Sequence, residues 1–329
     1  MKIGDIELTY GLCLGPMAGY TDFAMRSVCR SFGAEYLVSE MVSAKAVCYG
    51  DRKTVPLARV TPAEMPCAVQ LFGHEPEVLA EAARRIADGV RDGVAPAAID
   101  LNFGCPVHKI VSQGDGSAVM RDPALAERLV RAVSDAVKIP VTVKIRAGWD
   151  EAHKNASEVA RAAEAGGAAC IFVHGRTRTQ FYAGRADYGV IREVKKAVSI
   201  PVVGNGDVDS AEAGKRLLLE SGCDGIMVGR AAVGNPFLFR ELRAMRAGES
   251  CPAPTPEERY RTAARQLALA VSEKGEHTAV LEARKHLGEY LRGLHGAAAA
   301  RSRIFRAEDA ETLLAVLRET LGIAQENES

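Results

Sequence analysis

The stretch Ile99–Lys109 carries the residues best suited to chemistry. It reads Ile-Asp-Leu-Asn-Phe-Gly-Cys-Pro-Val-His-Lys, a short apolar run with alternating polar residues that breaks at Gly104. Asp100 and Asn102 are two positions apart, so on a strand they share one face. The pattern predicts a buried strand followed by a tight loop that presents the thiol of Cys105. That thiol is either a catalytic group or a buried structural one, because free cysteine is among the most buried residue types.

Candidate functional residues, most of them polar, also lie in or just after the other short apolar runs. A polar residue inside a short buried strand costs free energy unless it is satisfied or functional. One such residue carries little meaning, whereas one in nearly every strand indicates a ring of groups around a site. Besides Cys105, this ring contains Pro16, Met17, Ala18, Glu40, Met41, Gln70, Lys144, Arg146, His174, Arg176, Asn205, Gly206, Asp207, Gly229 and Arg230.

The first two-thirds of the chain alternates short apolar strands with amphipathic helices. Helix start signals include Asp122-Pro123 before 124–137 and Glu75-Pro76 before 77–89, and Gly166-Gly167 ends a helix over 156–165. Eight strands are predicted, at Leu12–Pro16, Tyr36–Ser39, Cys67–Phe72, Ala98–Asn102, Val141–Ile145, Cys170–His174, Val202–Asn205 and Gly225–Val228.

This alternation predicts a parallel sheet closed into a (β/α)8 TIM barrel, an α/β fold. The alternative is an open doubly wound sheet, which would carry a G-x-G-x-x-G turn after the first strand. The segment Gly15-Pro-Met-Ala-Gly19 is not such a turn. In a barrel, functional residues gather just past the carboxyl ends of the strands, and the candidate residues follow that rule.

Two glycine-rich turns follow the last two predicted strands. Loops at this place in a barrel often bind phosphate through backbone N–H groups, and Gly204–Asp207 and Gly229-Arg230 offer glycines and a guanidinium there. Two ordinary glycine turns are the alternative. Lys144 points into the predicted barrel and needs an anionic partner, because an unpaired buried lysine loses its charge. Flavin mononucleotide (FMN) meets both demands with its phosphate and its isoalloxazine ring.

The composition changes beyond Arg243. We predict a catalytic barrel over 1–245, a proline-containing linker over 246–256 and a small all-α domain over 257–329, beginning with the capping box Thr255-Pro-Glu-Glu258. This domain carries a local excess of basic residues, which is either a phosphate-binding patch or a solvated helix face. Its members are Arg284, Lys285, His286, Arg292, Arg301, Arg303 and Arg306.

The overall composition is that of an ordinary globular protein. The chain has 329 residues, 47% of them hydrophobic, and a formal net charge of zero, so any polyanion site must be a local patch. Its eight cysteines form no C-x-x-C pair and have no zinc-ligand spacing. The acidic N-terminus does not resemble a signal peptide, and no apolar run approaches the roughly 20 residues that span a bilayer. We therefore expect a cytoplasmic protein without a metal or a membrane partner.

The motifs, in their order along the chain, resemble those of a known family, the flavin-dependent tRNA-dihydrouridine synthases, and within it the bacterial B-type group. In the second domain, Arg284-Lys-His286 followed by Tyr290-Leu291 is similar to the helical domain of the family. The barrel motifs are Gly15-Pro-Met-Ala-Gly-Tyr-Thr-Asp22, Ser39-Glu-Met41, Val69-Gln-Leu-Phe-Gly73, Asp100-Leu-Asn-Phe-Gly-Cys-Pro106, Gly116-Ser-Ala118, Val143-Lys-Ile-Arg146, Val173-His-Gly-Arg-Thr-Arg178, Gly204-Asn-Gly-Asp207 and Gly229-Arg230.

The resemblance implies reduction of a uridine in tRNA to 5,6-dihydrouridine, with FMN as cofactor and NADPH as reductant. Cys105 would give a proton to C5 while hydride goes to C6. The cofactor would be bound by Pro16, Met17, Ala18, Gln70, Lys144, Asn205, Gly206, Asp207, Gly229 and Arg230, to which we add His174. The uridine or the tRNA backbone would contact Asn102, Lys109, Arg146, Arg176, Arg178, Arg284, Lys285, His286, Arg301 and Arg303.

Two positions depart from the family pattern. The family often has another basic residue at the position of His108 and alanine at that of Asp115. An acid in a loop close to tRNA phosphates would weaken binding there, so Asp115 is expected to affect substrate binding and not the class of reaction.

Two other functions remain open from the sequence. A flavin enzyme that reduces free pyrimidines would also place Cys-Pro in a barrel loop, but it would not need the basic helical domain. A barrel that binds RNA without chemistry would purify colourless, whereas a flavoprotein is yellow.

Overall fold

The computed structural model describes residues 1–324 and contains a closed barrel of eight parallel strands, as predicted. Its bounds match the predicted ones for four strands; β3 is shorter, and the other three strands run one to four residues further. The barrel strands are β3 (Leu12–Leu14), β4 (Tyr36–Ser43), β5 (Cys67–Phe72), β6 (Ala98–Phe103), β7 (Val141–Arg146), β8 (Cys170–His174), β9 (Val202–Asn205) and β10 (Gly225–Val228).

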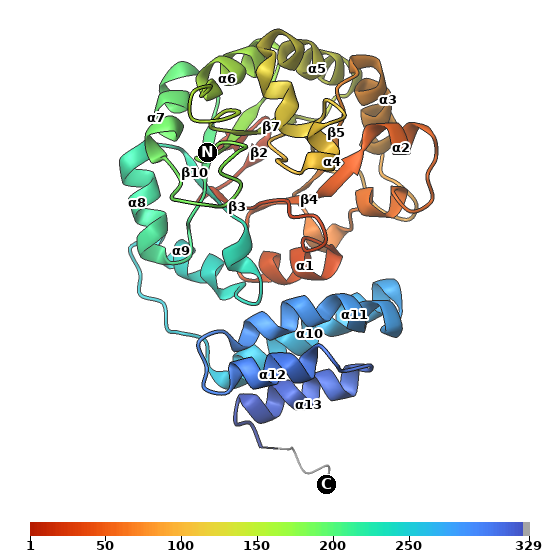
Figure 1. The fold of residues 1–329 in the computed structure, drawn as a ribbon, viewed down its shortest axis with the longest axis vertical. Coiled ribbons are helices and arrows are strands. Elements are labelled where there is room, and N and C mark those ends of the chain that lie inside the picture. The colour runs from red at the N-terminus through yellow and green to blue at the C-terminus, as the bar shows by residue number, and fades with distance from the viewer. Residues whose placement is uncertain (325–329) are drawn as a thin grey trace.

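Helices cover the outside of the barrel between successive strands (Figure 1). The predicted start signals are present: the Asp122 side chain accepts a hydrogen bond from the N–H of Leu125, and Pro123 is the first residue of its helix. The helices before the linker are α1 (Phe23–Ser31), α2 (Ala44–Cys48), α3 (Pro76–Ala87), α4 (His108–Val111), α5 (Pro123–Ala136), α6 (Ala156–Ala165), α7 (Tyr188–Ala197), α8 (Ala211–Ser221) and α9 (Phe237–Ala247).

A short N-terminal hairpin, which the sequence did not predict, precedes the barrel. Strands β1 (Lys2–Ile3) and β2 (Ile6–Glu7) pair antiparallel, and the buried side chain of Ile3 packs in one cluster with residues of the barrel interior. In the same cluster the rings of Tyr36 and Phe172 stack at 5.8 Å. The barrel is therefore a filled core rather than a pore, and its carboxyl end carries the open site.

An extended segment leads from α9 to the C-terminal helices. Helix α9 ends at Ala247, two residues past the predicted boundary at 245, and the side chain of Thr255 accepts the N–H of Glu258 at the start of the next helix. The C-terminal helices are α10 (Pro256–Lys274), α11 (Glu276–Leu287), α12 (Ala297–Ile304) and α13 (Ala310–Thr320). Residues 325–329 of the predicted helical domain lie outside the described residues.

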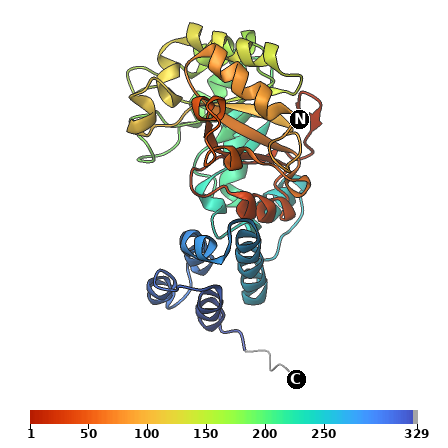
Figure 2. The ribbon, with the colours of Figure 1, turned by 90° about the vertical axis from the view of Figure 1, so that its right-hand side faces the viewer.

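The C-terminal helices have a hydrophobic cluster of their own and contact one side of the barrel (Figures 1 and 2). Helix α10 lies beside α1, where Lys274 donates to Asp22 at 2.6 Å. A second contact joins Arg59 of the barrel to Glu273 at 3.0 Å. These ion pairs set the helices next to the β3 side of the barrel. Among residues 1–324, no helix is long and apolar enough to cross a bilayer.

Candidate active site

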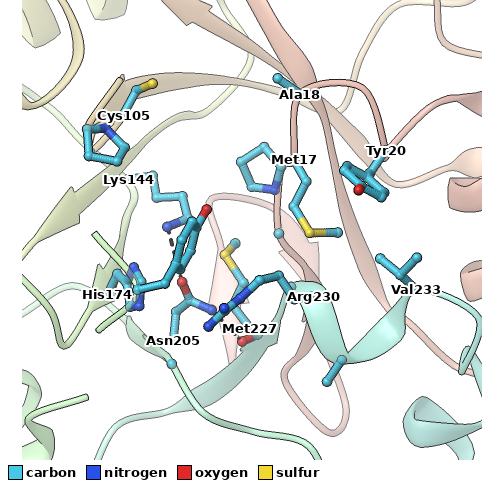
Figure 3. Close-up of a pocket in the computed structure, with 18 of the residues that line it drawn as sticks. Met17, Ala18, Tyr20, Cys105, Lys144, His174, Asn205, Met227, Arg230 and Val233 are labelled. Carbon is cyan, nitrogen blue, oxygen red and sulfur yellow. Dashed lines mark hydrogen bonds between the residues drawn. The ribbon is translucent and has the colours of Figure 1, made fainter. Parts of the chain in front are cut away.

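A cavity of about 690 Å³ opens at the carboxyl end of the barrel (Figure 3). Its wall is built from residues on all eight barrel strands or the loops that follow them, together with three residues of the C-terminal part. Most residues predicted for the site line this cavity: Pro16, Met17, Ala18, Gln70, Asn102, Cys105, Lys144, Arg146, His174, Asn205, Gly206, Asp207, Gly229, Arg230 and Lys285.

The backbone of Cys105 is fixed from both sides. The amide oxygen of Asn102 accepts the N–H groups of Gly104 at 3.1 Å and Cys105 at 2.8 Å. The hydroxyl of Ser117 donates to the carbonyl of Cys105 at 2.8 Å. Burial raises the pKa of the Cys105 thiol above its ordinary value. The cavity wall therefore presents a positioned thiol that stays protonated near neutral pH and can donate a proton.

A chain of buried hydrogen bonds supports this loop from below. Thr142 donates to one carboxylate oxygen of Asp100 at 2.6 Å, and the amide nitrogen of Gln70 donates to the other at 2.6 Å. The carbonyl of Gln70 then accepts the amide nitrogen of Asn102 at 2.8 Å. Asp100 thus fixes which way both amides point, and it leaves the oxygen of Asn102 free to hold Cys105. Burial raises the pKa of Asp100 to about 6.

Replacing Asp100 with alanine is expected to lower the free energy of unfolding by about 1–3 kcal/mol, because the buried amide of Gln70 loses its acceptor. Asp100→Asn should restore most of the loss, since its carbonyl can accept from Gln70 while its N–H₂ donates to the Thr142 hydroxyl. Urea denaturation of the three proteins measures the difference. Equal stability of the alanine and asparagine variants would show that the hydrogen bonds of Asp100 do not stabilise the protein.

Basic groups form one wall of the cavity. Lys144 donates to the side-chain oxygen of Asn205 at 3.2 Å, and burial, followed by the nearby Arg146, lowers its pKa to about 8. Arg146 is 3% exposed, and burial lowers its pKa to about 10. Burial and the charge of Lys144 lower the pKa of His174 well below its usual range, so this imidazole is neutral. Such a wall favours an anionic ligand.

The loops after β9 and β10 leave backbone donors free. Within residues 1–324 the N–H groups of Gly206, Gly229 and Arg230 have no hydrogen-bond partner. Gly206 has a φ of +127°, and a Cβ there would lie 2.6 Å from the Cβ of Ala186. Glycine is therefore required at this turn. Free N–H groups beside an arginine are a usual arrangement for binding phosphate.

A sequence model of one family matches nearly the whole chain. It is described as "Dihydrouridine synthase (Dus)" and covers residues 13–326. The chain belongs to this family. The match agrees with the predicted resemblance, and the family consists of enzymes that generally use flavin.

Members of the dihydrouridine synthase family are similar to this chain over almost their full length. A probable tRNA-dihydrouridine synthase of Rickettsia conorii is 42% identical over 306 residues, which are 92% of this chain and 91% of the relative. The tRNA-dihydrouridine synthase B of Pseudomonas aeruginosa is 40% identical over 328 residues, 99% of this chain and 97% of the relative. Histamine dehydrogenase from Rhizobium sp. 4-9, at 14% identity and a TM-score of 0.54 over 79% of this chain and 49% of that one, shares the fold.

Two residues predicted to contact the uridine or the tRNA backbone are buried and do not line the cavity. Arg176 is 2% exposed, and its guanidinium binds both carboxylate oxygens of Asp207 and the carbonyls of Ala183 and Gly184. It therefore holds the loop after β8 against the loop after β9. His286 is 4% exposed, and burial lowers its pKa to about 4. A neutral, enclosed imidazole cannot bind a phosphate at the surface.

The remaining predicted tRNA contacts lie outside the cavity wall. Arg284 donates two hydrogen bonds to the carbonyl of Ala307, and Arg303 forms an ion pair with Glu319 at 2.7 Å. These side chains are therefore partly engaged within the C-terminal helices. The others are Lys109, exposed on α4, Arg178, beside Trp149, and Arg301, half-buried on α12.

Asp115 does not line the cavity. It is 7% exposed and accepts a hydrogen bond from Nδ1 of His74 at 2.7 Å. The carboxylate is turned inward and bonded to His74, so its effect on tRNA binding stays a prediction. The contact instead joins the loop that follows Cys105 to the end of β5.

The sequence did not single out several aromatic and charged residues of the cavity wall. The ring of Tyr182 lies 4.1 Å from the guanidinium carbon of Arg230, and its neighbour Phe181 also lines the cavity. Their position a few residues after the His-Gly-Arg-Thr-Arg motif could have indicated them. The other aromatic and charged wall residues missed are Tyr20, Asp209 and Glu289, whereas Arg292 was predicted as a member of the basic patch.

No group of three or more histidine, cysteine, aspartate or glutamate side chains in residues 1–324 is arranged to hold a metal ion.

Proposed function

We propose that this enzyme reduces the C5=C6 bond of a uridine in tRNA to give 5,6-dihydrouridine, with FMN as cofactor and NADPH as reductant. The observation that carries the proposal is the Cys105 thiol, whose backbone is held by Asn102 and Ser117 in the wall of a cavity that also carries basic groups. A pyrimidine that accepts hydride at C6 needs a proton at C5, and a neutral thiol can supply it.

The cavity fits FMN in size and in chemistry. Its volume of about 690 Å³ lies within the range of small-molecule sites. The free N–H groups of Gly206, Gly229 and Arg230 suit the phosphate, and Lys144 and His174 suit the polar part of the ring. When bound and reduced, the flavin would supply the hydride. The protein's own residues would orient both reactants and exclude water.

The residues on the substrate side have separate roles in this proposal. Cys105 gives its proton to C5, and Asn102 keeps the Cys105 loop in place. Arg146 holds the loop around the site, because it donates to the carbonyls of Gly104, Thr177 and Phe181. Lys285, on α11, reaches the cavity wall from the C-terminal helices. We assign the tRNA-binding role to these helices, residues 257–329, and place the enzyme in the cytoplasm, where its eight cysteines would remain thiols.

The test is to incubate the purified protein with NADPH and tRNA that lacks dihydrouridine. The proposal expects a yellow protein with a flavin absorption band and dihydrouridine in the tRNA, detected by mass spectrometry of its nucleosides. Activity on free uracil but not on tRNA would support a pyrimidine reductase instead. A colourless protein that binds tRNA without changing it would support the RNA-binding barrel.

A further inference from the structure

Two arginines and the chain's single tryptophan form a cluster at the cavity end of the barrel. The guanidinium carbons of Arg121 and Arg178 lie 4.9 and 4.7 Å from the centroid of the Trp149 ring. Arg121 ends a short helical turn (Gly116–Arg121), whereas Trp149 and Arg178 follow β7 and β8. We call these three residues the Arg–Trp cluster.

The backbone fixes the cluster. The N–H of Arg178 donates to the carbonyl of Gly148 at 2.9 Å, and the N–H of Thr179 donates to that of Trp149 at 3.1 Å. These bonds join the loops after β7 and β8. The two guanidinium groups are therefore held at one ring by ordered backbone. This lowers the entropy cost of ordering these side chains when a ligand binds.

The charges of the cluster are not neutralised. In residues 1–324, neither the Arg121 nor the Arg178 side chain forms a hydrogen bond or an ion pair, and Nε of Arg178 is buried without a partner. The acids that follow Trp149, Asp150 and Glu151, are already paired with a histidine and a lysine of the same loop. Two like charges on one aromatic ring, without carboxylates to balance them, favour an anionic ligand.

The cluster lies across the cavity from the C-terminal helices. In the ring of eight strands, β7 is four strands from β3 in either direction and so lies opposite it. The C-terminal helices contact α1, which follows β3, whereas β7 and α6 lie on the far side (Figure 1). A molecule that enters the cavity and also contacts the helices would need a second anchor on the β7 side to be held at both ends.

We propose that the Arg–Trp cluster binds backbone phosphates of RNA on the β7 side of the cavity. The proposal rests on the proposed function, because it assumes that the ligand of the cavity is part of an RNA. Arginine suits this role, since its N–H groups match the geometry of phosphate oxygens and its flat face stacks on bases. The indole would act as a positioning group, because its ring already carries the two guanidinium groups.

The single tryptophan makes the first test direct. Titration of the flavin-loaded protein with tRNA should change the intrinsic fluorescence of Trp149 in a saturable way, after correction for absorption with free tryptophan. The change should track the binding curve measured by filter retention. A fluorescence signal that stays constant while tRNA binds would overturn the proposal.

The second test measures the salt dependence of binding. Arg121→Ala with Arg178→Ala should weaken tRNA binding about tenfold and reduce the slope of log affinity against log salt by about 1 to 2, because one or two phosphate contacts are lost. Arg121→Lys with Arg178→Lys should keep most of the slope. The matched control is Arg161→Ala, an exposed arginine in the middle of α6, which should change neither quantity. An unchanged slope in the alanine double variant would also overturn the proposal.

The outcomes separate this proposal from the function itself. If the alanine double variant formed dihydrouridine at the wild-type rate and bound tRNA with the wild-type affinity, the RNA site would be contradicted. The proposed function would stand. In another outcome, NADP⁺ quenches the Trp149 fluorescence of the wild type in a saturable way, tRNA does not change it, and the alanine double variant loses the NADP⁺ effect. This would assign the cluster to the nicotinamide cofactor and contradict the RNA site. Absence of dihydrouridine in the wild-type reaction would overturn the proposed function, and with it the assumption on which the RNA site rests.

Discussion

Cys105→Ala is expected to lower the rate of dihydrouridine formation by about 10²- to 10⁴-fold, the usual contribution of a positioned general acid. Burial raises the pKa of the thiol, so Cys105 stays protonated at neutral pH and has a proton to donate. Its backbone bonds to Asn102 and Ser117 fix its place in the cavity wall.

Flavin content and tRNA affinity should stay unchanged in Cys105→Ala. The contacts that place residue 105 run through its backbone, to Asn102 and Ser117, and alanine keeps both of them. The measurement is single-turnover reduction of tRNA by the pre-reduced protein, with flavin absorbance and filter binding as separate readouts. A lowered rate with intact binding separates the chemical role from a structural one.

Two other variants sharpen this test. Cys105→Ser keeps the size of the side chain but offers a hydroxyl whose proton is much harder to release, so it should be nearly as slow as alanine. Cys251→Ala changes a thiol in the linker, outside the cavity, and should react at the wild-type rate. Undiminished turnover in Cys105→Ala would mean that the thiol is structural and that another group protonates C5.

The sequence predicted the barrel and most of the cavity wall because both follow from short-range rules. Parallel strands buried on both faces are short apolar runs, so Cys67–Phe72 and Cys170–His174 could be bounded correctly. Once a barrel is predicted, the residue after each run must face the same end of the molecule. The sequence therefore predicts that Gln70, Cys105 and Lys144 lie at one end of the barrel, and all three line the cavity.

What the sequence could not show are contacts that join distant segments. Arg176 stands in a motif beside functional residues, and only the fold shows that Asp207, 31 positions later, takes up its charge. His286 lies in a basic run, but helix packing turns it inward onto Gln266 and Tyr20. A one-dimensional pattern gives the charge of a side chain and not the direction in which it points.

Lys144→Met is expected to weaken FMN binding by roughly 10- to 100-fold, which corresponds to the loss of one charged hydrogen bond of about 1.5–3 kcal/mol. The ammonium group of Lys144 donates to Asn205 and has Arg146 close by, and its pKa is lowered to about 8. An anionic ligand would relieve this cost because it stabilises the protonated lysine. Titration of the apoprotein by flavin fluorescence measures the affinity directly.

The pH dependence of that affinity gives a second signature. Since the anion binds the protonated lysine, affinity should be constant below about pH 8 and fall above it, by at most about tenfold per pH unit. The stability of the apoprotein should change the other way. The lysine is less protonated in the folded protein than in the unfolded chain between pH 8 and its ordinary pKa of 10.5, so its effect on stability becomes more favourable as the pH rises through that window.

Both slopes should disappear in Lys144→Met and persist in the control Lys138→Met, an exposed lysine just before β7 at the opposite end of the barrel. Lys144→Arg should keep the positive charge. The fall of FMN affinity with pH should then move to higher pH, because a guanidinium does not deprotonate in this range. If Lys144→Met bound FMN as tightly as the wild type at pH 7, the basic wall would have to hold a different anion, and the phosphate loops after β9 and β10 would carry the cofactor alone. The pH slope therefore distinguishes a lysine that contacts the flavin from one that only lines the cavity.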